Sequence, residues 1–70
     1  MAIGENVKRY RQKIGFTQKQ LADLCGVSHT RISELENGHS NPTVETLRII
    51  AERLETSIEK LIAVPKSRAS

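Results

Sequence analysis

The sequence predicts an all-α protein, a compact five-helix bundle. Three observations lead to this fold class. Apolar residues recur at the spacing of a helix in five successive segments. Residues that cap or terminate helices separate those segments. The 70 residues contain no internal repeat or low-complexity tract, and they allow one domain with a single hydrophobic core.

The first helix is expected at residues 3 to 13, with Gly15 as its stop signal. Gly4 in the first turn should cost little stability, because helix ends fray. Phe16 should anchor the following turn in the core. One side of this helix is apolar and consists of Ile3, Val7, Tyr10 and Ile14.

Residues 17 to 37, TQKQLADLCGVSHTRISELEN, predict two short helices joined by a tight turn. Thr17 and Gln20 have the spacing of a capping box at the first helix. Gly26 can end that helix in the left-handed conformation, and Ser28 is a good N-cap for the second helix. The inward side of the first helix should contain Leu21, Ala22, Leu24 and Cys25.

The second of these helices has a thin apolar stripe, Ile32 and Leu35. Neighbouring helices must therefore hold it while its polar side faces outward. This pattern suits a helix that reads the major groove of DNA, although a helical hairpin with a solvated face would look the same. The outward side consists of His29, Thr30, Arg31, Ser33 and Glu34.

Two more helices complete the predicted domain. Thr43 should cap a helix at residues 44 to 54, with Val44, Leu47, Ile50, Ala51 and Leu54 inward. Ser57 should cap a short helix at 58 to 62. We expect residues 1 to 64 to form the domain and residues 65 to 70 a flexible polar tail.

Charge and cysteine content narrow the function classes. The net charge of +3 suits a polyanionic partner, and the basic residues gather near the start while glutamates dominate from Glu34 onward. Solvated helix faces would also explain this asymmetry. The single cysteine, Cys25, excludes an internal disulfide and is expected in the core. His29 and His39 lack a third ligand nearby, so we expect no metal or cofactor. No signal peptide or membrane span is visible, which predicts a cytoplasmic protein.

A longer pattern resembles a known family. T-Q-x-x-L-A-x-x-x-G-V-S-x-x-x-I-S-x-x-E-N-G, then N-P-T-x-E-T-L and I-A-x-x-L, is similar to the Xre-type helix-turn-helix regulators, which include phage Cro and the lambdoid repressors. The resemblance covers about residues 3 to 62. Relatives usually place Gly or Asn after the fourth helix, where this chain has Glu55; a positive φ there would cost roughly 1 kcal/mol.

The resemblance implies a sequence-specific DNA-binding regulator. We expect no enzyme, because His29 and the glutamates would lie on a convex helix face without a cleft or a paired nucleophile. It implies an ion pair between Arg11 and Glu36, with the arginine also near a phosphate, and a phosphate contact for Gln18. From their chemistry we expect His29, Thr30, Ser33 and Glu34 to contact bases. The remaining expected phosphate contacts are Arg31, Asn37, His39, Ser40 and Asn41.

One such domain covers half a DNA site, so we expect a homodimer on a palindromic operator. It would activate transcription where its outward face contacts RNA polymerase. The expected dimer interface consists of Ile58, Leu61, Ile62 and Val64, although these residues could instead close the domain's own core. A protein-interaction module, such as an antitoxin whose main partner is a protein, is the alternative function.

Overall fold

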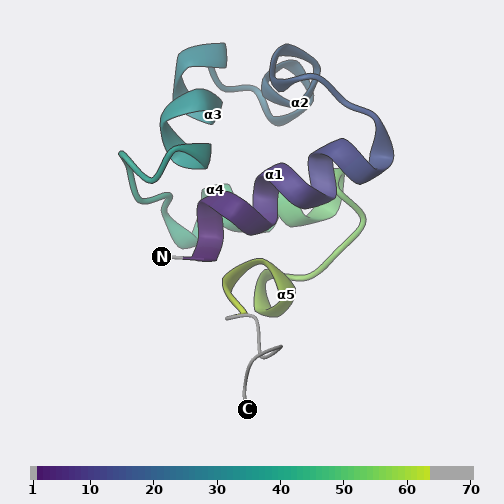
Figure 1. Ribbon diagram of the computed structural model, residues 1–70, viewed down its shortest axis with the longest axis vertical. Coiled ribbons are helices and arrows are strands. Elements are labelled where there is room, and N and C mark those ends of the chain that lie inside the picture. Colours follow the sequence, from purple (N-terminus) through teal and green to yellow (C-terminus); the bar gives the residue numbers. More distant parts are fainter. Residues whose placement is uncertain (1, 64–70) are drawn as a thin grey trace.

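The computed structural model describes residues 2 to 63, and all its regular elements there are helices, as the sequence predicts. Figure 1 shows α1 crossing the front of the bundle, with α2 and α3 above it and α5 below it. The helices are α1 (Ala2–Ile14), α2 (Gln18–Cys25), α3 (His29–Glu36), α4 (Val44–Arg53) and α5 (Ile58–Ile62). Val64 and the predicted tail at 65 to 70 lie outside the described residues.

The predicted helix caps are confirmed. Thr17 accepts from the backbone N–H of Gln20, whose side chain in turn accepts from the backbone N–H of Thr17. Gly26 ends α2 in the left-handed conformation, with φ of 74°. Ser28, Thr43 and Ser57 each accept from a backbone N–H in the first turn of their helix. These caps fix where α2 and α3 begin, and therefore how the two helices meet.

The core forms where all five helices converge. Its fully buried members come from every helix: Val7, Leu21, Ile32, Ile50 and Leu61. Cys25 also belongs to this core, as expected, and its burial raises the pKa of the thiol while nearby Arg53 lowers it. α3 packs against both α1 and α2, so it is held on two sides.

Three residues predicted to face inward are exposed instead. Ile14 is 41% exposed, Leu24 44% and Val44 65%. Each lies in the first or last turn of its helix. Helical periodicity predicts the side of a helix that a residue occupies, but not how far the neighbouring helix extends.

Gly4 has a role that the sequence prediction missed. It is buried, and a Cβ added there would lie 2.3 Å from the carbonyl oxygen of Leu35 and 2.9 Å from that of Glu36. The missing side chain therefore lets α1 approach the end of α3 closely. The prediction considered only the cost of a glycine in the first turn of a helix, and it did not anticipate this contact.

Asn6 is a second feature that the prediction missed. Its side chain is buried, and Nδ2 donates to the carbonyl oxygens of Leu61 at 2.7 Å and Ala63 at 2.8 Å. It thereby satisfies carbonyl groups at the end of α5, which have no partner within the helix. Glu55, in the turn before α5, adopts the positive φ considered above, at 58°.

Candidate nucleic-acid interface

α3 has one side committed to the fold and one side turned outward. Ile32, Leu35 and Glu36 are buried, at 1%, 4% and 8% exposure. The outward side contains the residues of the expected DNA-reading surface, although Ser33 is only partly exposed. Its exposed members are His29, Thr30, Arg31 and Glu34. The helix therefore presents a short polar strip on a firmly packed support.

The predicted ion pair between Arg11 and Glu36 is present and bidentate. Arg11 Nε donates to Glu36 Oε2 at 2.6 Å, and Nη2 donates to Oε1 at 3.1 Å. The third guanidinium nitrogen, Nη1, donates to the carbonyl oxygen of Phe16 at 2.8 Å. These bonds use three of the five N–H donors of a guanidinium, and the side chain is 10% exposed, so the expected phosphate contact of Arg11 stays a prediction. Arg11 holds α1, α3 and the turn after α1 together.

The Gln18 side chain lies between this ion pair and His29. Its Nε2 donates to Glu36 Oε1 at 2.9 Å, and its Oε1 is 3.0 Å from His29 Nε2. The nitrogen and the oxygen of the amide thus both form hydrogen bonds within the protein. The prediction of a phosphate contact did not include these bonds. Sequence spacing does not predict the contact between Gln18 and His29. These residues begin two different helices, which come together only because the chain turns at Gly26.

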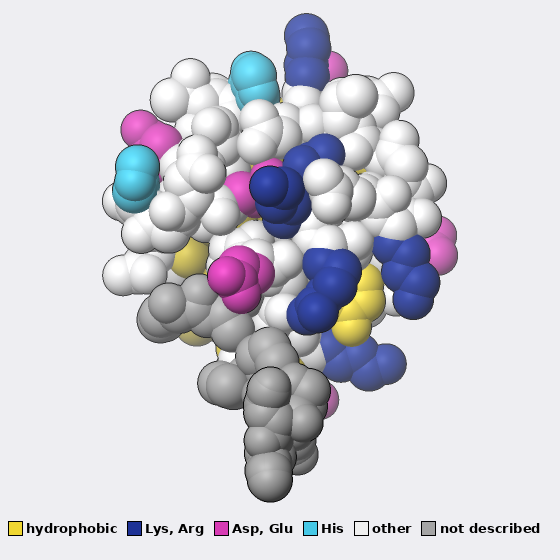
Figure 2. Space-filling view, viewed as in Figure 1, with side chains coloured by type: hydrophobic (Ala, Val, Ile, Leu, Met, Phe, Trp, Pro, Cys, Tyr) yellow, Lys and Arg dark blue, Asp and Glu magenta, His cyan; other side chains and the backbone are white. Residues whose placement is uncertain are grey.

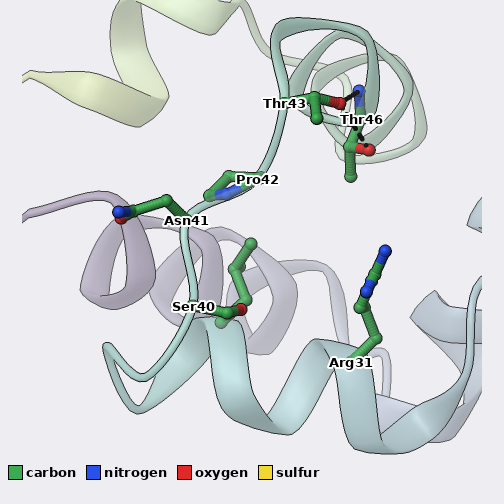
Figure 3. Close-up of a pocket in the computed structure, with 7 residues that line it drawn as sticks. Arg31, Ser40, Asn41, Pro42, Thr43 and Thr46 are labelled. Carbon is green, nitrogen blue, oxygen red and sulfur yellow. Dashed lines mark hydrogen bonds between the residues drawn. The ribbon is translucent and has the colours of Figure 1, made fainter.

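A small hollow separates α3 from the start of α4. Its volume is about 80 Å³. It brings together three expected phosphate contacts with two threonines that the prediction missed, and its lining includes Arg31, Ser40, Asn41, Thr43 and Thr46. In Figure 3 the Arg31 side chain rises from α3 toward Thr46, whereas the Asn41 side chain points away from Arg31.

The two threonines of the hollow hydrogen-bond to each other. Thr43 Oγ1 accepts from the backbone N–H of Thr46 at 3.1 Å and donates to Thr46 Oγ1 at 3.0 Å. Asn37 and His39, the other expected phosphate contacts, are exposed but do not line the hollow. They belong to the turn that ends α3, where the His39 N–H donates to the Glu34 carbonyl at 2.8 Å.

The residues expected at the dimer interface differ in how deeply the structure buries them. Leu61 is completely buried in the domain's own core, so its assignment to a dimer interface is wrong. Ile58 is partly buried against the same core, and Ile62 is 46% exposed. Ile58 and Leu61, three residues apart, share the inward side of the helix, whereas Ile62 directly follows Leu61 and points outward.

Figure 2 shows where charged side chains and histidines lie on one face of the molecule. Lys and Arg side chains lie mainly over the centre and right of this view, whereas both histidines lie at the upper left, on the side of α3. Lys8, Arg9 and Lys13 are exposed on α1. Across residues 2 to 63, no cluster of three or more His, Cys, Asp or Glu side chains is arranged to hold a metal ion. No helix in this range has the length and apolar character needed to cross a membrane.

The fold and the α2–α3 geometry agree with a family comparison. A family model described as helix-turn-helix matches residues 7 to 61. The chain belongs to this helix-turn-helix family, and the Xre-type resemblance is confirmed.

The chain is similar to named regulators of that family. It is 40% identical over 60 residues to control protein C.SmaI of Serratia marcescens, covering 86% of this chain and 71% of that protein. It is 43% identical over 61 residues to the cryptic phage CTXphi transcriptional repressor RstR of Vibrio cholerae, covering 87% of this chain and 54% of that repressor. The chain therefore spans about half the length of the phage repressor.

Solved structures also share the fold. The biofilm regulator SinR in complex with DNA superposes with a TM-score of 0.83 and 29% identity, over 87% of this chain and 98% of that one. An enzyme, the hydroxypropylphosphonic acid epoxidase of S. wedmorenis, also contains a similar segment, with a TM-score of 0.80 and 31% identity over 86% of this chain. That segment is 32% of the epoxidase chain.

Proposed function

We propose that this chain is a sequence-specific DNA-binding transcriptional regulator that reads the major groove with α3. The observation that supports it most strongly is the polar strip on α3, exposed on one side of a helix whose other side is buried. The similarity to SinR, whose structure contains DNA, and to a transcriptional repressor supports the same function.

The base contacts would come from His29, Thr30, Ser33 and Glu34. A threonine methyl group can pack against the methyl group of thymine, and a serine hydroxyl can donate or accept. Glu34 can accept from the amino group of cytosine, which would offset the repulsion between a carboxylate and DNA. Each good side-chain contact would discriminate between bases by about 1–3 kcal/mol.

A backbone phosphate would occupy the hollow between α3 and α4. Arg31 supplies a positive charge, and Ser40 and Thr46 supply hydroxyl groups at its wall. The start of α4 adds the partial positive charge of a helix N-terminus. Asn37, His39 and Asn41, all exposed around the turn after α3, would contact neighbouring phosphates. The backbone N–H of Gln18, in the first turn of α2, remains available for a further phosphate contact.

Binding would require two copies of the chain on an approximate palindrome. Two α3 helices would then enter successive major grooves about 34 Å apart. Ile62, half-exposed on α5, is the apolar residue available for a twofold contact, together with Ile58 and, outside the described residues, Val64. Replacing Ile62 with Glu should convert dimers to monomers in sedimentation experiments. Persistent dimers would move the interface away from α5.

Regulation would follow from where the operator lies. Binding over a promoter would repress transcription, and contact between the outward face and RNA polymerase would activate it. A regulator of this kind works where the bacterial chromosome is, in the cytoplasm. We propose no enzymatic activity, because the hollow beside α3 is lined by no carboxylate, imidazole or thiol that could act as a base or nucleophile.

Selection of bound sequences from random duplex DNA tests this function. The proposed function predicts one enriched palindrome with half-sites about one helical turn apart. It also predicts that affinity falls steeply with rising salt, because counterions are released when phosphates are neutralised. No enrichment, together with salt-insensitive binding to a protein, would favour the alternative of an interaction module.

A further inference from the structure

The Gln18 amide connects a buried ion pair to the first residue of the DNA-reading strip. Glu36 Oε1 receives hydrogen bonds from Arg11 Nη2 and from Gln18 Nε2. A carboxylate paired with an arginine is only an acceptor, so it must face the NH₂ group of the amide. The buried pair therefore fixes which way the Gln18 amide points.

This orientation determines which nitrogen of His29 carries a proton. With its NH₂ group on Glu36, Gln18 presents the carbonyl oxygen to His29 Nε2, 3.0 Å away. A carbonyl oxygen only accepts, so Nε2 must be the protonated nitrogen. The other ring nitrogen, Nδ1, has no hydrogen-bond partner among residues 2 to 63.

We infer that Gln18 and Glu36 are positioning residues for His29, and that the neutral imidazole reads an exocyclic amino group of adenine or cytosine through Nδ1. In a neutral imidazole whose Nε2–H donates a hydrogen bond to Gln18, the unprotonated Nδ1 can only accept one. In the major groove, only adenine N6 and cytosine N4 offer donors. The first residue of the strip thus presents an acceptor to the bases. Guanine offers only acceptors in the major groove, so this tautomer cannot bind guanine through Nδ1.

The inference rests on the proposed function, and it differs from a phosphate role for the Gln18 side chain. A phosphate contact contributes about equally to the affinity for every DNA sequence, so its loss weakens binding to all sequences alike. A positioning role acts through one base pair, so its loss changes base preference at that position alone. The two roles therefore give different results with the same variant.

The experiment measures base preference at every operator position at pH 8. Wild type is compared with His29→Ala, with Gln18→Met and with the double variant, and Gln12→Ala serves as the control. Methionine keeps the length of glutamine without its hydrogen bonds. Gln12 is an exposed glutamine on α1 outside the proposed contacts. Thermal unfolding of each variant checks that the fold is intact.

We expect wild type to prefer one base pair by about tenfold at the position that His29 contacts, and to lose this preference when purine replaces the adenine, or 2-pyrimidinone the cytosine, and so removes the amino group. His29→Ala and Gln18→Met should each reduce that preference to about twofold, at the same position. The double variant should resemble the singles, and Gln12→Ala should resemble wild type.

Two results would overturn the inference while leaving the proposed function standing. One is uniform weakening by Gln18→Met with unchanged base preference. The other is a wild-type affinity that is unchanged when the amino group is removed from the adenine or cytosine of the His29-dependent base pair. Failure of wild type to select any sequence would instead contradict the proposed function itself.

Discussion

The two sides of α3 differ in how tightly the protein constrains them. On the inner side, Glu36 is held by a bidentate arginine, and the last turn touches Gly4 so closely that a methyl group would not fit. On the outer side, Thr30, Arg31 and Glu34 are exposed. The fold therefore fixes the position of α3 through its inner side and leaves the outer side chains free to contact a partner.

The largest effect is expected from breaking the inner ion pair. Replacing Glu36 with Ala leaves the Arg11 guanidinium buried without its counter-charge, and it should lower the free energy of unfolding by about 3–5 kcal/mol. In a small domain such a loss can unfold the protein. Urea denaturation followed by circular dichroism measures it.

Glu34→Ala, on the outer side of the same helix, is the matched control for this variant. Because Glu34 is exposed, the change in unfolding free energy should stay within about 0.5 kcal/mol. Equal losses for the two glutamates would remove the contrast between the sides of α3.

A smaller effect is expected at the contact between α1 and α3. Gly4→Ala places a Cβ 2.3 Å from the Leu35 carbonyl oxygen, so the two backbones must move apart. Overpacking of this kind costs about 1–3 kcal/mol, even though alanine favours helix formation. Thermal unfolding measures it, with Glu5→Ala at the exposed neighbouring position as control. A more stable Gly4→Ala variant would contradict the close approach.

A change on the outer side should affect binding without affecting stability. Thr30→Tyr should reduce operator affinity by at least about tenfold, because the contact is lost and the bulky ring obstructs the groove. Fluorescence anisotropy with labelled operator measures affinity, and circular dichroism measures helicity. Full affinity in the tyrosine variant would contradict the assignment of Thr30 to the DNA-reading surface.

The smallest effect on stability is expected at Glu55, which lies outside α3. Glu55 adopts φ of 58°, a conformation that glycine reaches without a steric penalty. Glu55→Gly should therefore raise the unfolding free energy by about 0.5–1 kcal/mol in urea denaturation. A destabilised variant would mean that the Glu55 side chain contributes more than its backbone strain costs.

The sequence predicted the features that depend on local chemistry. The caps at Thr17, Ser28 and Thr43 and the left-handed Gly26 follow from nearby residues, and the structure confirms them. The Arg11–Glu36 pair was predicted from the resemblance to a family, and it is also present. Local chemistry therefore fixed the helix ends, while the family pattern supplied a long-range contact.

The features that were missed depend on how helices approach one another. Gly4 matters because of the end of α3, Asn6 because of the end of α5, and Leu61 is buried because α1 covers it. None of these partners is near in sequence. The assignment of Gln18 to a phosphate overlooked His29 and Glu36 for the same reason. Residue spacing cannot reveal contacts that arise only after folding.

The central claim is that the outer side of α3 meets the edges of base pairs. It is tested most directly by following the backbone amide signals of the protein by NMR while the selected duplex is added. The claim predicts that the largest shifts occur in residues 28 to 34 and, around the adjoining hollow, in residues 40 to 46. Shifts confined to α1 and α5, with residues 28 to 34 unchanged, would contradict it.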